Sequence, residues 1–181
     1  SRSGNNMNVC ALTRNRGVVL YNTGGTGANH SLYGRQFEIS EDNKITYPPN
    51  TSSSISNVNL TGFGHSVLRV RDDAFIVFHR TNSTNGGTAK TIIANPNAFF
   101  TEVGSLVTSN DMYGAFEAVY LDENTHTILL LAQSYSNSRA LIGKVFKVDP
   151  LTLSIEPLSQ DFIINNGTNS GIAVNAYVVK N

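Results

Sequence analysis

Short runs of apolar residues recur along the chain and divide it into three segments with the same layout. The clearest runs are Val18–Tyr21, Phe75–Phe78 and Ile128–Leu131. Runs this short, bounded by turn residues, predict strands, and their continuity predicts burial on both faces. Each run belongs to the second of four strands predicted in its segment. The predicted strands are Met7–Thr13, Val18–Tyr21, Leu32–Ile39, Ile45–Tyr47, His65–Val70, Phe75–Phe78, Thr88–Ala94, Phe100–Val103, Phe116–Leu121, Thr127–Leu131, Leu141–Val148 and Leu153–Pro157.

The connections between these strands alternate between short and long. The short ones are rich in Asp, Asn, Pro and Gly, as hairpin turns require: Arg14–Gly17, Ser40–Lys44, Arg71–Ala74, Asn95–Phe99, Asp122–Thr125 and Asp149–Thr152. The long ones are Asn22–Ser31, Pro48–Gly64, His79–Gly87, Gly104–Ala115, Ser134–Arg139 and Leu158–Gly171. Alternate connections of an antiparallel meander leave at opposite ends, so all long connections are predicted to share one side. We expect the binding surface on that side, because recognition residues concentrate on loops held by a rigid scaffold.

The length and apolar content of the chain fit a single all-β domain. It has 181 residues, of which 40% are hydrophobic, enough for a sizeable core. The predicted repeat units are about 5–60, 61–112 and 113–165, and a last strand is predicted at 171–181. Because the sequence begins with Ser1 and not with methionine, we expect it to be part of a longer chain.

Charge and hydropathy argue against two classes of partner. The formal net charge is zero and only 14% of residues are charged, so no basic face is expected to attract a nucleic-acid backbone. The longest apolar run, Ile128–Ala132, is far shorter than a membrane-spanning helix, and we expect no membrane insertion. The single cysteine, Cys10, lies in a predicted strand and is expected to be a small buried apolar residue.

Two carboxylates stand out on the side of the long connections. Asp111 and Asp161 occupy similar positions in two connecting segments. With Asn110 and backbone carbonyls they would supply the oxygen ligands that Ca²⁺ prefers, and as a pair they would supply the acid and base of a glycoside hydrolase, with His65 in support. The alternative is that both aspartates only cap turns. The four histidines show no metal-binding spacing.

The long connections also carry amide, guanidinium and aromatic side chains. Sugars are bound by stacking on aromatic rings and by hydrogen bonds from amides and charged groups, and a protein partner would use the same Tyr and Arg anchors. The absence of Trp weakens the prediction of sugar binding. The candidate ligand-binding residues are His30, Phe63, Arg80, Asn82, Tyr113, Tyr135, Asn137 and Arg139.

The repeated four-stranded unit resembles the blades of β-propellers, although no Trp-Asp dipeptide or Asp-box is present. This resemblance implies a propeller-like stack of four-stranded antiparallel meanders. The alternative is a β-sandwich or barrel whose strand lengths happen to repeat. Since familiar propellers carry at least four blades, either the last strand closes the first sheet or two copies combine as a six-bladed ring.

The Asn/Ser/Thr/Gly-rich, Trp-free composition is also similar to that of the distal receptor-binding domains of phage or virus spikes and fibres. That resemblance implies a non-enzymatic attachment module on the virion surface, or otherwise extracellular. Its partner would be a host cell-surface glycan or protein, with calcium as an additional ligand. The alternatives are a propeller-type glycan hydrolase or lyase, and a structural domain that only mediates assembly.

Overall fold

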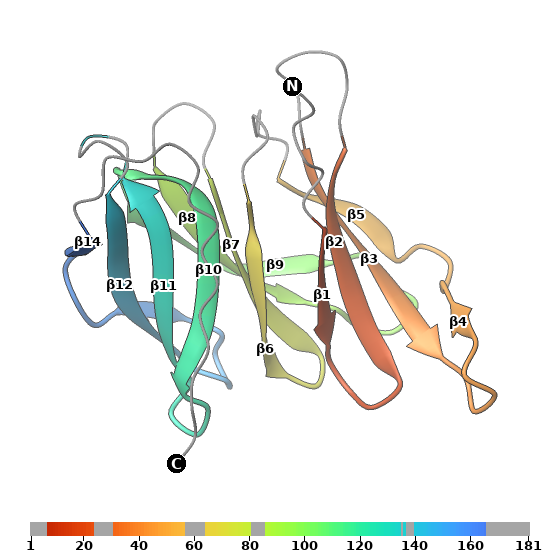
Figure 1. The fold of residues 1–181 in the computed structure, drawn as a ribbon. Coiled ribbons are helices and arrows are strands. Elements are labelled where there is room, and N and C mark those ends of the chain that lie inside the picture. The colour runs from red at the N-terminus through yellow and green to blue at the C-terminus, as the bar shows by residue number, and fades with distance from the viewer. Residues whose placement is uncertain are drawn as a thin grey trace.

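The fold consists of three antiparallel β-sheets packed side by side, each built from consecutive strands (Figure 1). The computed structural model describes residues 7–23, 31–56, 64–80, 86–134, 136 and 140–165. In these ranges every regular element is a strand, and no helix is long and apolar enough to cross a membrane. The all-β class and the repeat of four-stranded meanders predicted from the sequence are therefore confirmed.

The strands follow one another within each sheet, as expected for meanders. Sheet 1 contains β1 (Met7–Ala11), β2 (Arg16–Thr23), β3 (Ser31–Ile39), β4 (Ile45–Thr46) and β5 (Ser52–Ser56). Sheet 2 contains β6 (Ser66–Arg71), β7 (Ala74–Arg80), β8 (Gly87–Ile93) and β9 (Thr101–Ser109). Sheet 3 contains β10 (Met112–Asp122), β11 (Thr127–Ser134), β12 (Leu141–Val148), β13 (Ile155–Pro157) and β14 (Phe162–Asn165).

At the outer edge of each sheet, next to the third strand, more residues are in strands than the sequence predicted. In sheet 2, β9 runs along the whole of β8. In sheets 1 and 3 the same edge is divided, since β4 and β5 both pair with β3, and β13 and β14 both pair with β12. Parts of the predicted long connections between sheets are therefore strands. The Ser-rich sequence of β5 gave little apolar signal, and the four residues of β14, all exposed, form too short a run to indicate a strand.

Two apolar clusters hold the three sheets together. Sheets 1 and 2 meet through Cys10, Leu12, Val18, Leu20, Leu32 and Ile55 on one side and Phe75, Val77, Ile92 and Ala94 on the other. Sheets 2 and 3 meet through a cluster that includes Ile76 and Phe78 of β7, and Ile128, Leu130 and Phe146 of sheet 3. Successive residues of β7 thus point to opposite neighbours, because side chains alternate across a strand.

The second strand of each sheet tests the prediction of burial on both faces. That prediction is confirmed for β7, in which residues 74–79 are all buried. In β11, Ile128, Leu130 and Leu131 are buried, but Leu129 is partly exposed. The prediction is wrong for β2, where Val18 and Leu20 are fully buried but Val19 and Tyr21 are partly exposed. The difference between β7 and β2 arises from position: sheet 2 has a neighbour on each side, whereas sheet 1 has a described neighbour only on the face that Val18 and Leu20 share.

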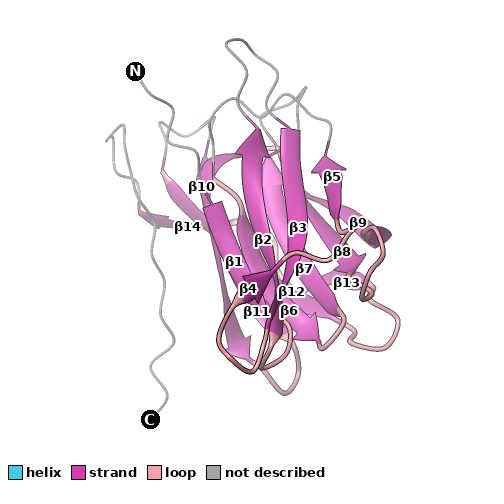
Figure 2. Ribbon diagram, turned by 90° about the vertical axis from the view of Figure 1, so that its right-hand side faces the viewer, coloured by secondary structure: helices cyan, strands magenta, loops and turns pink. Residues whose placement is uncertain are grey.

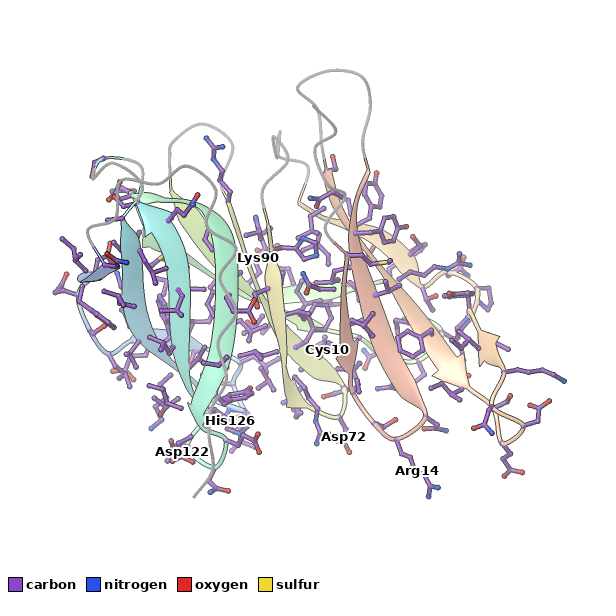
Figure 3. All side chains as sticks on the ribbon, in the orientation of Figure 1. Cys10, Arg14, Asp72, Lys90, Asp122 and His126 are labelled. Atoms are coloured by element: carbon purple, nitrogen blue, oxygen red, sulfur yellow. The ribbon has the colours of Figure 1, made fainter. Side chains whose placement is uncertain are left out.

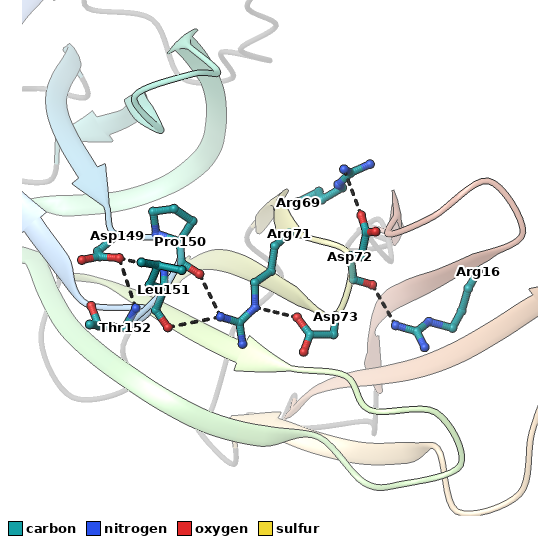
Figure 4. Close-up of polar contacts among 9 residues, drawn as sticks. All are labelled: Arg16, Arg69, Arg71, Asp72, Asp73, Asp149, Pro150, Leu151 and Thr152. Carbon is teal, nitrogen blue, oxygen red and sulfur yellow. Dashed lines mark hydrogen bonds and ion pairs between the residues drawn. The ribbon is translucent and has the colours of Figure 1, made fainter.

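The short turns form one edge of the molecule and link neighbouring sheets, as Figure 4 shows. Arg16 of sheet 1 donates from Nη2 to the carbonyl of Asp72 in sheet 2 at 2.8 Å. Arg71 of sheet 2 donates to the carbonyl of Pro150 in sheet 3 at 2.8 Å and pairs with Asp73 at 2.6 Å. Figure 3 places Arg14, Asp72 and Asp122 along this edge. The short turns therefore have the structural role that their composition predicted.

Two polar side chains in the third strands form further hydrogen bonds between neighbouring sheets near this edge. Gln36 in β3 donates to the carbonyls of Asn95 and Ala98 in sheet 2, both at 2.9 Å. Thr91 in β8 donates to the carbonyl of Leu153 in sheet 3 at 2.7 Å. In each case the acceptor lies in the turn between the third and fourth strands of the next sheet. The same contact thus recurs at both interfaces, so the three sheets stack in one repeated orientation.

Candidate functional site

The second strands end and the third strands begin at the opposite edge of the sheets from the short turns (Figure 1). This arrangement follows from the antiparallel pairing of each second strand with its third strand. Among the predicted ligand-binding residues, Arg80 ends β7 at this edge and is partly buried, and the backbone of Tyr113 lies in β10. The others lie outside the described residues: His30, Phe63, Asn82, Tyr135, Asn137 and Arg139.

The two predicted carboxylates, Asp111 and Asp161, lie in the same pocket. The pocket has a volume of about 530 Å³ and is shared by sheets 2 and 3. Sheet 2 supplies the end of β9, and sheet 3 supplies β12 and the segment before β14. Its lining residues are Val107, Thr108, Ser109, Asn110, Asp111, Lys144, Gln160 and Asp161. The sequence predicted these carboxylates from their similar positions in two connections, and the fold brings them to one place.

Lys144 provides the positive charge of this pocket. Its side chain is only 14% exposed, and its Nζ lies 3.1 Å from Oδ1 of Asp161. The same ammonium donates to the carbonyl of Thr108 in sheet 2 at 2.7 Å. Ser109, also in sheet 2, donates from its hydroxyl to the other carboxylate oxygen of Asp161. Asp161 and Lys144 therefore join sheets 2 and 3 at the floor of the pocket.

Asp111 is held on the other side of Ser109. Its backbone N–H donates to Oγ of Ser109 at 3.1 Å. Its carboxylate accepts from the backbone N–H of Ser136 at 2.6 Å and from the hydroxyl of Ser134. All four carboxylate oxygens of Asp111 and Asp161 thus accept from protein groups, which orders the pocket wall before any ligand arrives.

The sequence analysis did not single out Lys144 and Ser109. Lys144 lies on the same face of β12 as the buried Ile142 and Phe146. A usable signal was present in the repeat, since Lys90 occupies the corresponding place in the third strand of the second segment. Nothing in the sequence pairs Lys144 with Asp161, because the contact depends on how β14 and the segment before it fold back beside β12 within sheet 3.

The pocket offers oxygen ligands, but its carboxylates already have a cationic neighbour. Among the described residues, no cluster of three or more His, Cys, Asp and Glu side chains could hold a metal ion. Calcium at Asp161 would have to share the carboxylate with Lys144, or displace its ammonium. The calcium site stays a prediction, and its test is given below.

His65 and His79 lie apart from the pocket lining and are deeply buried, with 2% and 1% of their surface exposed. Burial lowers the pKa of each imidazole to about 4. His79 also donates from Nδ1 to the carbonyl of Arg80 at 2.8 Å, which fixes its tautomer. These histidines are neutral at physiological pH. The predicted supporting role of His65 in a carboxylate pair has no counterpart among the residues of the pocket.

Two acidic residues of the short turns hold the backbone of their own turns. Asp122 accepts from the N–H of Asn124 at 2.9 Å, and Asp149 accepts from the N–H of Leu151 at 2.7 Å. Hydrogen bonds from Thr125 and Asn124 lower the pKa of Asp122, and those from Thr152 and Leu151 lower the pKa of Asp149. Cys10 is buried between sheets 1 and 2, as predicted, and burial raises the pKa of its thiol to about 11.

A second pocket lies at the opposite edge, in sheet 1. It has a volume of about 890 Å³ and lies between the two short turns of that sheet, where Arg14, Glu38 and Glu41 contribute to its lining. Its walls are hairpin turns of a single sheet, whereas the pocket of Asp111 and Asp161 draws on two sheets and a bonded network. The pocket of Asp111 and Asp161 is therefore the better-organised candidate for a binding site. Residues of the pocket in sheet 1 supply control substitutions.

Comparisons with protein-family models, with characterised proteins and with solved structures gave no significant match for this chain.

Proposed function

We propose that this domain is a non-enzymatic recognition module that binds a cell-surface receptor, in the first instance a glycan, at the edge carrying the long connections. The observation that supports the proposal is the polar pocket of Asp111, Lys144 and Asp161 at that edge. Its volume is in the range of small-ligand sites. Its lining of amide, hydroxyl, carboxylate and ammonium groups matches the hydroxyl-rich surface of a sugar.

The rigidity of the pocket also supports a binding role. Ser109, Lys144 and Asp161 hold one another across two sheets, so little side-chain freedom is left to lose when a ligand binds. Asn110 and Gln160 line the same pocket, and both residues are exposed, so their amides are accessible to a ligand. With the low-charge, Asn/Ser/Thr-rich composition, this arrangement favours an attachment domain of a phage or virus spike or fibre, working at the virion surface.

A glycan array with the purified domain tests this proposal. We expect binding to at least one class of bacterial or host surface glycan, weakened at least tenfold when Asn110 and Gln160 are both replaced by alanine. Loss of two amide hydrogen bonds to a bound sugar, each worth about 1 kcal/mol, accounts for this effect. The matched control is Glu41→Ala, which changes an exposed polar residue in the pocket of the opposite edge.

Three results would contradict the proposal. Binding lost only in Glu41→Ala would move the site to the short-turn edge. Binding to a surface protein and to no glycan would change the class of receptor. The domain would be a hydrolase or lyase if it turned over a bound glycan and lost this activity in the Asp111→Asn, Asp161→Asn double variant. The shared pocket of the two carboxylates supports this alternative.

Calcium is tested separately by thermal unfolding. If Asp111 and Asp161 bind Ca²⁺, millimolar calcium stabilises the native state by about 2.7 kcal/mol at a concentration one hundred times the Kd, because the ion binds the folded chain alone. We expect the melting temperature to rise by several degrees over that in chelator, and the rise to vanish in the Asp111→Asn, Asp161→Asn variant. Equal melting temperatures in calcium and in chelator would discard the site.

A further inference from the structure

A basic side chain recurs at one position of the third strand in every sheet. The residues are Arg35 in β3, Lys90 in β8 and Lys144 in β12. Each stands one residue before the position of Gln36, Thr91 and Val145, and each points away from the following sheet. Lys90 and Lys144 are mostly buried, with 17% and 14% of their side chains exposed.

The two lysines make the same pair of contacts. Lys90 donates to the carbonyl of Ile55 in the preceding sheet at 3.1 Å and pairs with Glu102 of its own sheet at 2.7 Å. Lys144 donates to the carbonyl of Thr108 in the preceding sheet at 2.7 Å and pairs with Asp161 of its own sheet at 3.1 Å. Each lysine therefore donates a hydrogen bond to the outer strand of the sheet before it.

The accepting residues are also equivalent. Ile55 has no partner in the pairing of β5 with β3, and Thr108 has none in the pairing of β9 with β8. Each is the extra residue of a β-bulge, which leaves its carbonyl free of the ladder. Sheet 3 has the same bulge: Ile164 is skipped where β14 pairs with β12, between the partners of Leu141 and Ile142.

At each end of the stack, one of the two partners of this contact, the basic side chain or the bulge carbonyl, has no counterpart among the described residues. Arg35 is exposed and lies 4.4 Å from the centre of the Tyr47 ring of its own sheet, with no preceding sheet in the described part of the chain. Ile164 is exposed at the other end, where the described residues form no following sheet. The donor that lacks a bulge and the bulge that lacks a donor are complementary.

Apolar residues are exposed at the same two ends of the stack. On the outer face of sheet 1, Met7 and Val9 are 68% and 63% exposed, and Figure 2 shows no described strand of another sheet in front of that face. In sheet 2 the position of Val9 is held by Val67, which packs against sheet 1. At the far end, Phe162 and Ile164 lie over Gly143 and remain exposed. Exposed apolar faces of this kind mark interaction surfaces.

We propose that two copies of this chain associate head to tail, with sheet 3 of each copy packed against sheet 1 of the other, in a closed ring of six sheets. Arg35 of one copy donates to the carbonyl of Ile164 in the other, as Lys90 does to Ile55. A head-to-tail contact gives a ring when its rotation closes. Closed propellers carry about four to eight blades, so with three sheets per chain two copies are the number that fits.

Analytical ultracentrifugation of the full chain tests the ring. We expect a concentration-dependent species of twice the monomer mass and nothing larger. Arg35→Glu should weaken association at least tenfold, because the carboxylate would face a carbonyl. Arg35→Lys should associate as the parent does, since lysine makes this contact at the two internal interfaces. Arg14→Glu, in an exposed short turn, is the matched control, and thermal melts check that every variant is folded.

Cross-linking distinguishes the orientation of the two copies. In a Cys10→Ala background, chains carrying Arg35→Cys are mixed with chains carrying Ile164→Cys and treated with a short bis-maleimide. A covalent dimer that needs both variants supports the head-to-tail contact. A dimer from Arg35→Cys chains alone would show a back-to-back contact and overturn the proposal. A monomer at all concentrations, an unlimited polymer, or a dimer unaffected by Arg35→Glu would overturn it as well.

Discussion

Replacing Phe146 with alanine is expected to lower the free energy of unfolding by about 3–5 kcal/mol, the usual cost of deleting a large buried aromatic side chain. Phe146 is fully buried in the cluster between sheets 2 and 3, and its ring centre lies 5.9 Å from that of Phe78. The cavity would therefore open at the contact between two sheets. Urea unfolding followed by circular dichroism measures the loss.

A double-mutant cycle with Phe78→Ala assigns this loss to the interface. The two rings belong to different sheets, so we expect a coupling of about 0.5–1.5 kcal/mol, as for other aromatic pairs. Leu151→Ala is the control, because its side chain is 84% exposed and its loss should cost less than about 0.5 kcal/mol. Additive effects, or a loss below about 1 kcal/mol for Phe146→Ala, would mean that the sheets do not pack as described.

Acidification is the second perturbation expected to have a large effect. Burial lowers the pKa of His65 and of His79 from 6.5 to about 4 in the folded chain. The unfolded chain therefore binds more protons than the folded chain below pH 6.5, so the free energy of unfolding falls as pH falls from about 6.5 to 4. Between pH 7 and pH 5 we expect a loss of about 2 kcal/mol for each histidine.

Urea unfolding at a series of pH values measures this slope. Replacing either histidine by glutamine should reduce the dependence on pH, and replacing both should nearly remove it above pH 5, although each variant is less stable at pH 7 than the parent. A parent chain equally stable at pH 7 and pH 5 would contradict the burial of these imidazoles. At still lower pH, Asp122 and Asp149 add to the loss, because their pKa values are lowered in the folded chain.

The meander repeat was predictable because its signals are local. Apolar runs such as Phe75–Phe78, together with the Asp- and Asn-rich turns after the first and third strands, depend only on neighbouring residues. The strand β5 was missed because its sequence is mostly serine, and β14 was missed because four residues are too few to establish a strand pattern. Leu153 was equally unpredictable: it adopts a left-handed φ of 61°, where the corresponding turns use Asn43 and Asn97, and its side chain is buried.

The candidate site was predictable only in part. Asp111 and Asp161 were chosen because both fall in long connections, and they do line one pocket. The repeat of Lys90 and Lys144 gave a signal for one partner, but the sequence does not place Lys144 and Ser109 beside each other, since they come from different sheets. Their proximity is a property of the packing between sheets 2 and 3, which has no local signature in the sequence.

The sequence by itself determined the all-β class, the three meanders and the side on which the long connections gather, because strand period and turn chemistry act over a few residues. The tertiary structure alone decided which faces are covered. Val19 and Val77 occupy corresponding places in two similar strands, yet Val77 is fully buried and Val19 is partly exposed. Burial depends on a neighbouring sheet, and for the outer faces of sheets 1 and 3 the proposed neighbour is a second copy of the chain.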